Sequence, residues 1–218
     1  MKPVIVFGTG DFADIVSFIL EEKLGLSIAA YAVHERFRQE DSYRGRPLVA
    51  LEECQCRFSP ASFDAALAII GKKMFTQREA VFSDLVKMGY RIRNVIDPRA
   101  SLDTDRIGQG NIILAGASIE AHCSIGDGNI LWQNVVLPHH NQIGNFNNLA
   151  PSVSFSGYSC AGDHCFIGNN VCVKNRVRIP DWCFIGAGAY VSMRLQEGDM
   201  VVPEKSKLLA GKSGFDFL

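Results

Sequence analysis

Two adjacent histidines, His139 and His140, are the side chains of this chain best suited to moving a proton at neutral pH. An imidazole with a pKa of about 6.5 can accept a proton there, as a general base must. The two lie in the segment Val136-Leu137-Pro138-His139-His140-Asn141-Gln142-Ile143-Gly144. The alternative interpretation is that both are solvated turn residues without a chemical role.

Three histidines, His122, His140 and His164, share one position in a six-residue repeat, and a histidine trio can bind zinc. His122 and His140 are 18 residues apart, but His140 and His164 are 24 apart, which places His164 on another face. The sequence therefore predicts no metal site.

A glycine-rich segment near the N-terminus, Gly8-Thr9-Gly10-Asp11-Phe12-Ala13, follows a short apolar stretch and precedes a helical pattern. It fits the Gly-x-Gly-x-x-Ala fingerprint, in which backbone N–H groups and a helix N-terminus can hold a phosphate. We predict that Gly8, Thr9, Gly10, Asp11 and Phe12 bind part of a substrate.

Two further segments follow predicted strands and extend this candidate substrate site. His34, Glu35 and Arg36 follow the second strand, where a contact to a ribose or a base would fall. Gly71, Lys72 and Lys73 follow the third strand and could meet phosphate charge. The alternative for the two lysines is a solvated loop.

Residues 1–97 alternate predicted strands and helices. The strands span Pro3–Phe7, Ile28–Val33, Phe63–Ile70 and Arg91–Ile96. One helix places Phe12, Ile15, Ile19 and Leu20 on one face, and a second spans Thr76–Met88. This alternation favours a small parallel sheet, wound like half of a dinucleotide-binding fold.

From residue 107 to residue 191 an apolar residue recurs at every sixth position. Such a period is typical of a parallel β-helix, in which three hexads make one turn and residues 18 apart stack on one another. The repeat predicts about five coils. A glycine follows the apolar residue at six steps, which we attribute to corners of tight, sometimes positive-φ geometry: Gly108, Gly126, Gly144, Gly162, Gly168 and Gly186.

We therefore expect an N-terminal domain over residues 1–97, a β-helix over residues 98–203, and a tail over residues 204–218 that caps the open end of the coil. Cys123, Cys165 and Cys183 occupy one inward position of the hexad, so we predict reduced, packed thiols.

The hexads resemble those of the hexapeptide acyltransferases, and nearly the whole chain resembles the nucleotide-sugar and sialic-acid acetyltransferase family. The resemblance implies a left-handed β-helix and a homotrimer with sites between subunits. It also implies acetyl-CoA as acyl donor, a UDP-, dTDP- or GDP-linked amino sugar as acceptor, and a role in bacterial surface-polysaccharide synthesis. Many relatives carry a histidine in the glycine-rich loop where this chain has Phe12.

The same resemblance assigns roles around the histidine pair. It implies that His139 is the base, and that the next residue is an acid that orients the base. Here that residue is His140, so either His140 orients His139 or the two have exchanged roles. Gly157 stacks 18 residues after His139, and the resemblance gives a glycine amide the role of oxyanion donor. A structural corner glycine is the alternative. Gly157, Gly186, Ala187 and Gly188 are expected to line the acetyl-CoA groove.

The composition narrows the remaining possibilities. Twenty-two basic and 23 acidic residues leave a net charge of −1, which gives no reason to expect nucleic acid or an anionic membrane as partner. No signal sequence or membrane span is evident, and seven scattered cysteines fit a reducing cytoplasm.

The sequence thus predicts a cytoplasmic, acetyl-CoA-dependent N-acetyltransferase acting by direct attack on the thioester, without an acyl-cysteine intermediate. Three alternatives remain open. They are a sugar O-acetyltransferase of the sialic-acid type, a γ-carbonic-anhydrase-like metalloenzyme, and a non-catalytic β-helix.

Overall fold

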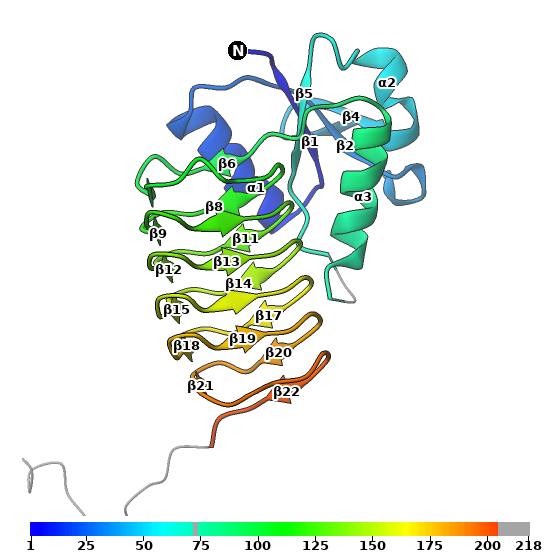
Figure 1. Ribbon diagram of the computed structural model, residues 1–218. Coiled ribbons are helices and arrows are strands. Elements are labelled where there is room, and N and C mark those ends of the chain that lie inside the picture. Colours follow the sequence, from blue (N-terminus) through cyan, green and yellow to red (C-terminus); the bar gives the residue numbers. More distant parts are fainter. Residues whose placement is uncertain (72–73, 205–218) are drawn as a thin grey trace, which may run out of the picture.

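The computed structural model describes residues 1–71 and 74–204. Figure 1 shows a small sheet-and-helix unit at one end of a stack of coils. Lys72 and Lys73, and the expected cap within residues 205–218, lie outside the described residues. Within the described part, no helix is both long enough and apolar enough to cross a membrane.

The N-terminal unit is built on a five-stranded sheet with the order β3-β4-β2-β1-β5. Every pairing is parallel except that of β3 with β4. Its strands are β1 (Val4–Phe7), β2 (Ile28–Val33), β3 (Ser42–Tyr43), β4 (Arg46–Ala50) and β5 (Asp64–Leu67). The sequence pattern missed β4, because its apolar residues form only a short run after a turn.

The prediction of a strand over Arg91–Ile96 in this sheet is wrong. Ile92 makes only an isolated bridge to Ala65, and β6 (Val95–Ile96) pairs instead with β8 (Ile112–Ile113) of the coil. The first coil therefore begins before residue 98, because β6 continues directly into the stacked strands.

Helices cover both faces of the N-terminal sheet (Figure 1). Val4 and Val6 of β1 share one apolar cluster with α1 (Asp11–Phe18), whereas Ile5 and Phe7 share another with α3 (Thr76–Lys87). α1 continues into a π-helical turn, η1 (Ile19–Lys23), and the remaining short helices are η2 (Glu35–Phe37), η3 (Leu51–Glu53) and α2 (Cys54–Arg57). Ile15, predicted on the inner face of α1, is exposed, and Val16 is buried in its place.

The coils form three parallel sheets of four, six and seven strands, and from β8 to β21 each strand pairs with the strand 18 residues away. The predicted stacking period is thus confirmed. The four-stranded sheet contains β10 (Ser124–Ile125), β13 (Gln142–Ile143), β16 (Cys160–Ala161) and β19 (Arg178–Ile179). The six-stranded sheet contains β7 (Ser101–Leu102), β9 (Ser118–Ile119), β12 (Val136–Leu137), β15 (Ser154–Phe155), β18 (Cys172–Val173) and β21 (Tyr190–Val191). The seven-stranded sheet contains β6, β8, β11 (Ile130–Leu131), β14 (Asn148–Leu149), β17 (Phe166–Ile167), β20 (Phe184–Ile185) and β22 (Met200–Val201).

Three corners join these sheets, and positive φ angles mark each corner. The histidine corner lies between the six- and four-stranded sheets and carries His122, His140, Tyr158 and Arg176. The α3 corner lies between the four- and seven-stranded sheets and carries Gly110, Gly128, Phe146, His164 and Trp182. The third corner carries Gly116, Asn134, Ser152, Asn170 and Gly188.

The repeated glycines do not have positive φ angles, so that part of their explanation is wrong. Most of these positions require glycine because a Cβ would collide with the next coil, as Gly144 illustrates. A Cβ at Gly144 would lie 2.2 Å from Oδ1 of Asp163, whose carboxylate accepts the Asn145 backbone N–H. The glycine makes room for a side chain of the next coil.

Apolar side chains and thiols fill the coil. Cys123, Cys165 and Cys183 are all free and fully buried, as predicted. Burial raises the pKa of the Cys165 thiol to about 12, so this thiol is protonated at neutral pH.

Arg78 of α3 connects the N-terminal unit to the β-helix through hydrogen bonds. Its buried guanidinium donates to the carbonyls of Leu67 and Ile69 beside the N-terminal sheet, and to those of Gly110 and Gly128 at the α3 corner. Burial lowers the pKa of Arg78 to about 9, so the group still carries its charge at neutral pH. The α3 corner therefore lies directly beneath α3.

Candidate active site

His139 and His140 follow β12 and form the turn of the histidine corner. His140 adopts the left-handed backbone conformation, with a φ angle of 62°, and this turns its ring back toward its neighbour. The Nδ1 atoms of the two imidazoles lie 3.1 Å apart, which is hydrogen-bonding distance. The corner thus brings together the two histidines that the sequence singled out.

Gly157, in the next coil, lies directly against the His139 ring. A Cβ at residue 157 would be 2.6 Å from Cε1 and 2.9 Å from Nε2 of His139, so no larger residue fits without moving the imidazole. Within the described residues, the backbone N–H of Gly157 donates no hydrogen bond. The residue that packs against the His139 ring therefore carries an open backbone donor.

The peptide that carries this N–H is held in place from behind. The carbonyl of Ser156 accepts hydrogen bonds from the buried side chain of Asn141, at 2.9 Å, and from the Ser159 hydroxyl. Asn175 fixes the following peptide by donating to the Gly157 carbonyl at 2.6 Å. Sequence reasoning missed these residues, because the period shows which positions stack but not which side chains form hydrogen bonds there.

His140 lies within a stack of rings along the histidine corner. Its ring centroid is 4.7 Å from that of His122 and 4.6 Å from that of Tyr158, and Arg176 lies over the Tyr158 ring. Desolvation, together with His122, His139 and Arg106, lowers the pKa of His140 below its ordinary value. This environment favours a neutral His140 at neutral pH.

The third histidine of the possible metal trio lies elsewhere, as its spacing predicted. His164 is at the α3 corner, stacked on Trp182 with ring centroids 4.1 Å apart, and it contacts Met74 and Glu79. Among residues 1–71 and 74–204, no group of histidine, cysteine and carboxylate side chains is arranged to hold a metal ion.

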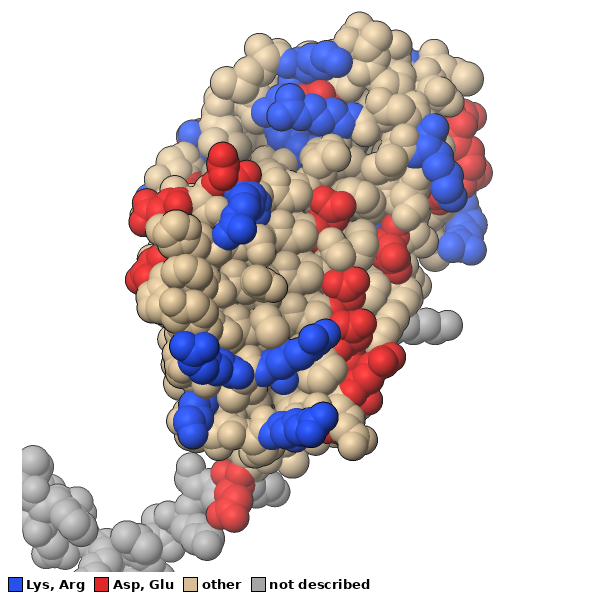
Figure 2. All heavy atoms as spheres, viewed as in Figure 1, with Lys and Arg blue, Asp and Glu red and all other residues tan. Residues whose placement is uncertain are grey.

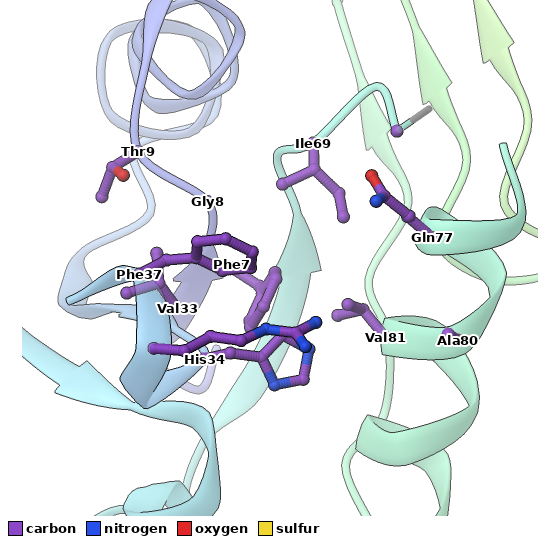
Figure 3. A pocket seen from close by; sticks show the side chains of 12 residues that line it. Phe7, Gly8, Thr9, Val33, His34, Phe37, Ile69, Gln77, Ala80 and Val81 are labelled. Carbon is purple, nitrogen blue, oxygen red and sulfur yellow. The ribbon is translucent and has the colours of Figure 1, made fainter. Parts of the chain in front are cut away.

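A separate pocket of about 460 Å³ opens at the carboxyl ends of β1, β2 and β5. In parallel sheets this edge is the usual ligand site. Figure 3 shows Phe7, Val33, His34 and Phe37 facing Gln77, Ala80 and Val81 of α3 across the pocket. Its lining is mainly apolar, with a few polar groups, which is the usual make-up of a small-molecule site.

Five predicted substrate-binding residues line this pocket: Gly8, Thr9, His34, Arg36 and Gly71. Gly8 is required by close approach, because a Cβ there would lie 2.5 Å from the carbonyl oxygen of Ala68. The turn after β1 is therefore tight enough to bring backbone groups against a ligand.

Four other predicted residues that the structure describes, Gly10, Asp11, Phe12 and Glu35, do not line the pocket. The N–H of Gly10 already donates to the Tyr43 hydroxyl, at 3.1 Å. Phe12 is buried and packs against Trp132 of the coil, with ring centroids 5.6 Å apart. Asp11 and Glu35 are exposed beside the pocket rather than in it. Phe12 thus serves the junction with the β-helix.

Glu52 supports the pocket from outside, although no sequence pattern indicated this residue. Its carboxylate is 3.1 Å from Nδ1 of His34 and accepts the backbone N–H of Glu35, also at 3.1 Å. Desolvation raises the pKa of Glu52, but these and other hydrogen bonds outweigh it, and the net shift is downward. An ionised Glu52 holds Nδ1 of His34 and leaves Nε2 for a ligand.

The pocket and the histidine pair lie at different corners of one chain. The pocket is lined by Gln77, Ala80 and Val81 of α3, and Arg78 of the same helix contacts the α3 corner, whereas His139 lies at the histidine corner. Gly186, Ala187 and Gly188 are at the third corner, so one chain does not bring them to His139. Figure 2 shows acidic side chains in a line down one edge of the coils, with basic side chains over the last coils.

Residues 106–139 match the family model of the bacterial transferase hexapeptide (six repeats). This match and the three parallel sheets fit a left-handed β-helix. No curated protein matches the sequence significantly.

Solved structures of similar fold cover almost the whole chain. The acetyltransferase domain of PglB from Neisseria gonorrhoeae, in complex with acetyl coenzyme A, is 22% identical with a TM-score of 0.79, over 91% of this chain and 95% of that chain. A mutant of perosamine N-acetyltransferase from Caulobacter crescentus, in complex with CoA and GDP-perosamine, is 23% identical with a TM-score of 0.81, over 92% and 93%. WeeI from Acinetobacter baumannii is 22% identical with a TM-score of 0.80, over 93% and 97%. The chain therefore has the fold of these proteins, N-terminal unit included.

Proposed function

We propose that this protein is an acetyl-CoA-dependent N-acetyltransferase whose acceptor is a nucleotide-linked amino sugar. The observation that carries the proposal is the contact between the His139 imidazole and the backbone of Gly157. It pairs a base with an open N–H donor, the two groups that acyl transfer from a thioester requires. Proteins of the same fold bind acetyl coenzyme A, or CoA with GDP-perosamine, which supports this donor and acceptor.

In this proposal His139 takes a proton through Nε2 from the attacking amine as the new N–C bond forms. The Gly157 N–H donates to the carbonyl oxygen of the thioester, which becomes negative during the attack. The hydrogen bond from Asn141 to the Ser156 carbonyl fixes the direction of that N–H. When the C–S bond breaks, His139 returns the proton to the sulfur. The buried cysteines take no part, which is consistent with direct attack.

The N-terminal unit is then a Rossmann-like domain that holds the nucleotide in the pocket at the strand ends. Because the pocket and His139 lie at different corners of one chain, the acceptor reaches a base on a neighbouring subunit. We therefore propose a homotrimer with sites between subunits, in which Gly186, Ala187 and Gly188 of one subunit line the acetyl-CoA groove beside another subunit's His139.

The protein is proposed to act in the cytoplasm, in the synthesis of a surface polysaccharide. All seven cysteines are free, which fits a reducing compartment.

A thiol-release assay with acetyl-CoA and a panel of UDP-, dTDP- and GDP-linked amino sugars tests the proposal. We expect release with at least one acceptor and an amide product by mass spectrometry; an ester would indicate O-acetylation. His139→Ala should lower kcat by about 100-fold or more. Activity only on free sugars would contradict the pocket assignment, and equal, near-wild-type rates for His139→Ala and His140→Ala would contradict the site.

Subunit sharing has its own test. Sedimentation should give the mass of three chains. Co-expression of a His139→Ala chain with a His34→Ala chain should restore activity, because some interfaces then join an intact pocket to an intact base. Mixtures no more active than either parent would contradict a shared site.

A further inference from the structure

We propose that His140 is a positioning residue that shares the proton taken up by His139, so that the two imidazoles act as one base. This inference rests on the proposed function, in which His139 is the base. The partner of the base is then a neutral, titratable imidazole, and not the acid that the family resemblance implies at this position.

The geometry of the pair determines the tautomers. Only one of the two Nδ1 atoms, 3.1 Å apart, can carry the hydrogen that joins them. For Nε2 of His139 to accept a proton from substrate, His139 must carry its hydrogen on Nδ1. Nδ1 of His140 is then the acceptor, and the hydrogen of His140 lies on Nε2.

The corner holds the His140 ring in this orientation. Tyr158 stacks on His140 at an interplanar angle of 18° and meets the His139 ring edge-on, at a centroid distance of 5.2 Å. His122 lies on the opposite side of the stack, one coil away. Because residues at a corner recur every 18 positions, one ring from each neighbouring coil packs against His140.

Among residues 1–71 and 74–204, no carboxylate forms an ion pair with either ring of the pair. His140 is surrounded by His122, His139 and Tyr158, with Arg106 bonded to the His122 carbonyl and Arg176 over Tyr158. The carboxylate of Glu120 accepts the backbone N–H of His139, at 3.0 Å, rather than a ring N–H. Within the described residues, no carboxylate pairs with either imidazole, and the lowered pKa of His140 agrees with this surrounding.

The proton balance follows from these positions. As the amine N–H bond breaks and the N–C bond forms, Nε2 of His139 gains a proton. The hydrogen on Nδ1 of His139 can then move to Nδ1 of His140, so one positive charge is spread over two rings. When the C–S bond breaks, the hydrogen returns to His139, and Nε2 delivers its proton to the sulfur. No other reactant is required.

Two isosteric variants separate proton sharing from mere orientation. In His140→Asn, the amide oxygen stands where Nδ1 stood, and asparagine tolerates the left-handed corner, but the amide cannot take a proton. In His140→Asp, a carboxylate stands there instead. We expect kcat/KM at pH 7 to fall by about 100-fold in His140→Asn. His140→Asp should lose less, and its acidic limb should move to higher pH by about one unit, because the negative charge raises the pKa of His139.

Nuclear magnetic resonance of protein labelled with ¹⁵N-histidine tests the pair without any acceptor. In the wild type we expect the Nδ1–H form of His139 and the Nε2–H form of His140. Their titrations should be coupled, so that His140→Asn moves the His139 titration and His139→Asn moves that of His140. Retention of the Nδ1–H form of His139 in His140→Asn shows that orientation is preserved.

Independent titrations, or a His140→Asn enzyme within about twofold of the wild-type rate, would overturn proton sharing. If the wild type acetylates no acceptor, the proposed function fails, while the titrations still decide whether the pair shares a proton.

Discussion

The imidazole of His139 lies directly against the backbone of Gly157, one coil away along the histidine corner. The contact is so close that Cβ of any larger residue would come within 2.6 Å of the ring. One pair of residues thus combines a proton acceptor with a backbone donor, and the stacking of coils fixes their separation.

Gly157→Ala tests this contact. The alanine methyl must push the His139 ring aside, whereas the backbone at residue 157 needs no left-handed φ angle. We expect kcat to fall by about 100-fold, the scale for loss of a positioned general base, with little change in the unfolding temperature. Gly144→Ala is the contrast, because its Cβ would meet the Gly162 backbone carbonyl at 2.6 Å and should destabilise the coil. Full activity in Gly157→Ala would show that the contact has no catalytic role.

Glu52→Gln should weaken binding of the nucleotide sugar specifically. The carboxylate accepts hydrogen bonds from His34 and from the Glu35 N–H, and an amide cannot accept both in the same way. We expect KM for the acceptor to rise about tenfold, equal to about 1.4 kcal/mol, with kcat and KM for acetyl-CoA unchanged. Glu53→Gln is the matched control, because Glu53 forms a 4.0 Å surface pair with Arg57 and does not line the pocket. A parallel rise in both KM values would argue against a dedicated acceptor pocket.

Arg78→Met should destabilise the junction between the two parts of the chain. Removing the guanidinium leaves four carbonyl oxygens without their donor. We expect a loss of about 3 kcal/mol in the free energy of unfolding, measured by denaturant titration. Arg91→Met, at an exposed position, should change it by less than about 0.5 kcal/mol. Equal effects of the two substitutions would refute the role of Arg78.

Asp97→Asn should show a pH-dependent loss of stability. Hydrogen bonds from the Arg99 side chain, together with that from its backbone N–H, lower the pKa of Asp97 below its ordinary value of 3.8. A carboxyl with a lowered pKa stabilises the folded state above the ordinary value, and this contribution fades as the pH falls through the folded-state pKa.

We expect the Asp97→Asn variant to be less stable than the wild type by about 1.5 kcal/mol at pH 7, and the difference to shrink below pH 3.8. Denaturant titrations at pH 7 and below pH 3.8 measure this difference in the free energy of unfolding. The exposed Asp103→Asn provides the control. A difference that stays constant with pH would rule out the ionised carboxylate as its source.

The sequence by itself determined the β-helix. A single apolar position in each hexad must point inward at every turn, so the period alone sets the three sheets and the 18-residue stacking. That stacking also predicted that Gly157 lies over His139, and that His164 lies away from His122 and His140. The strand-helix alternation likewise predicted β1, β2, β5 and α3.

Only the tertiary structure decided what depends on contacts between segments far apart. Arg91–Ile96 did not form a strand of the N-terminal sheet, because Val95 and Ile96 pair with a coil strand instead. Phe12 packs against Trp132 at the junction with the β-helix. Glu52 contacts His34 because the chain between β2 and β5 folds back to it. The hydrogen bond between His139 and His140 depends on a left-handed φ angle and on the rings stacked from neighbouring coils. A repeat fixes which positions stack, but the side chains at those positions, packed together in space, determine the chemistry.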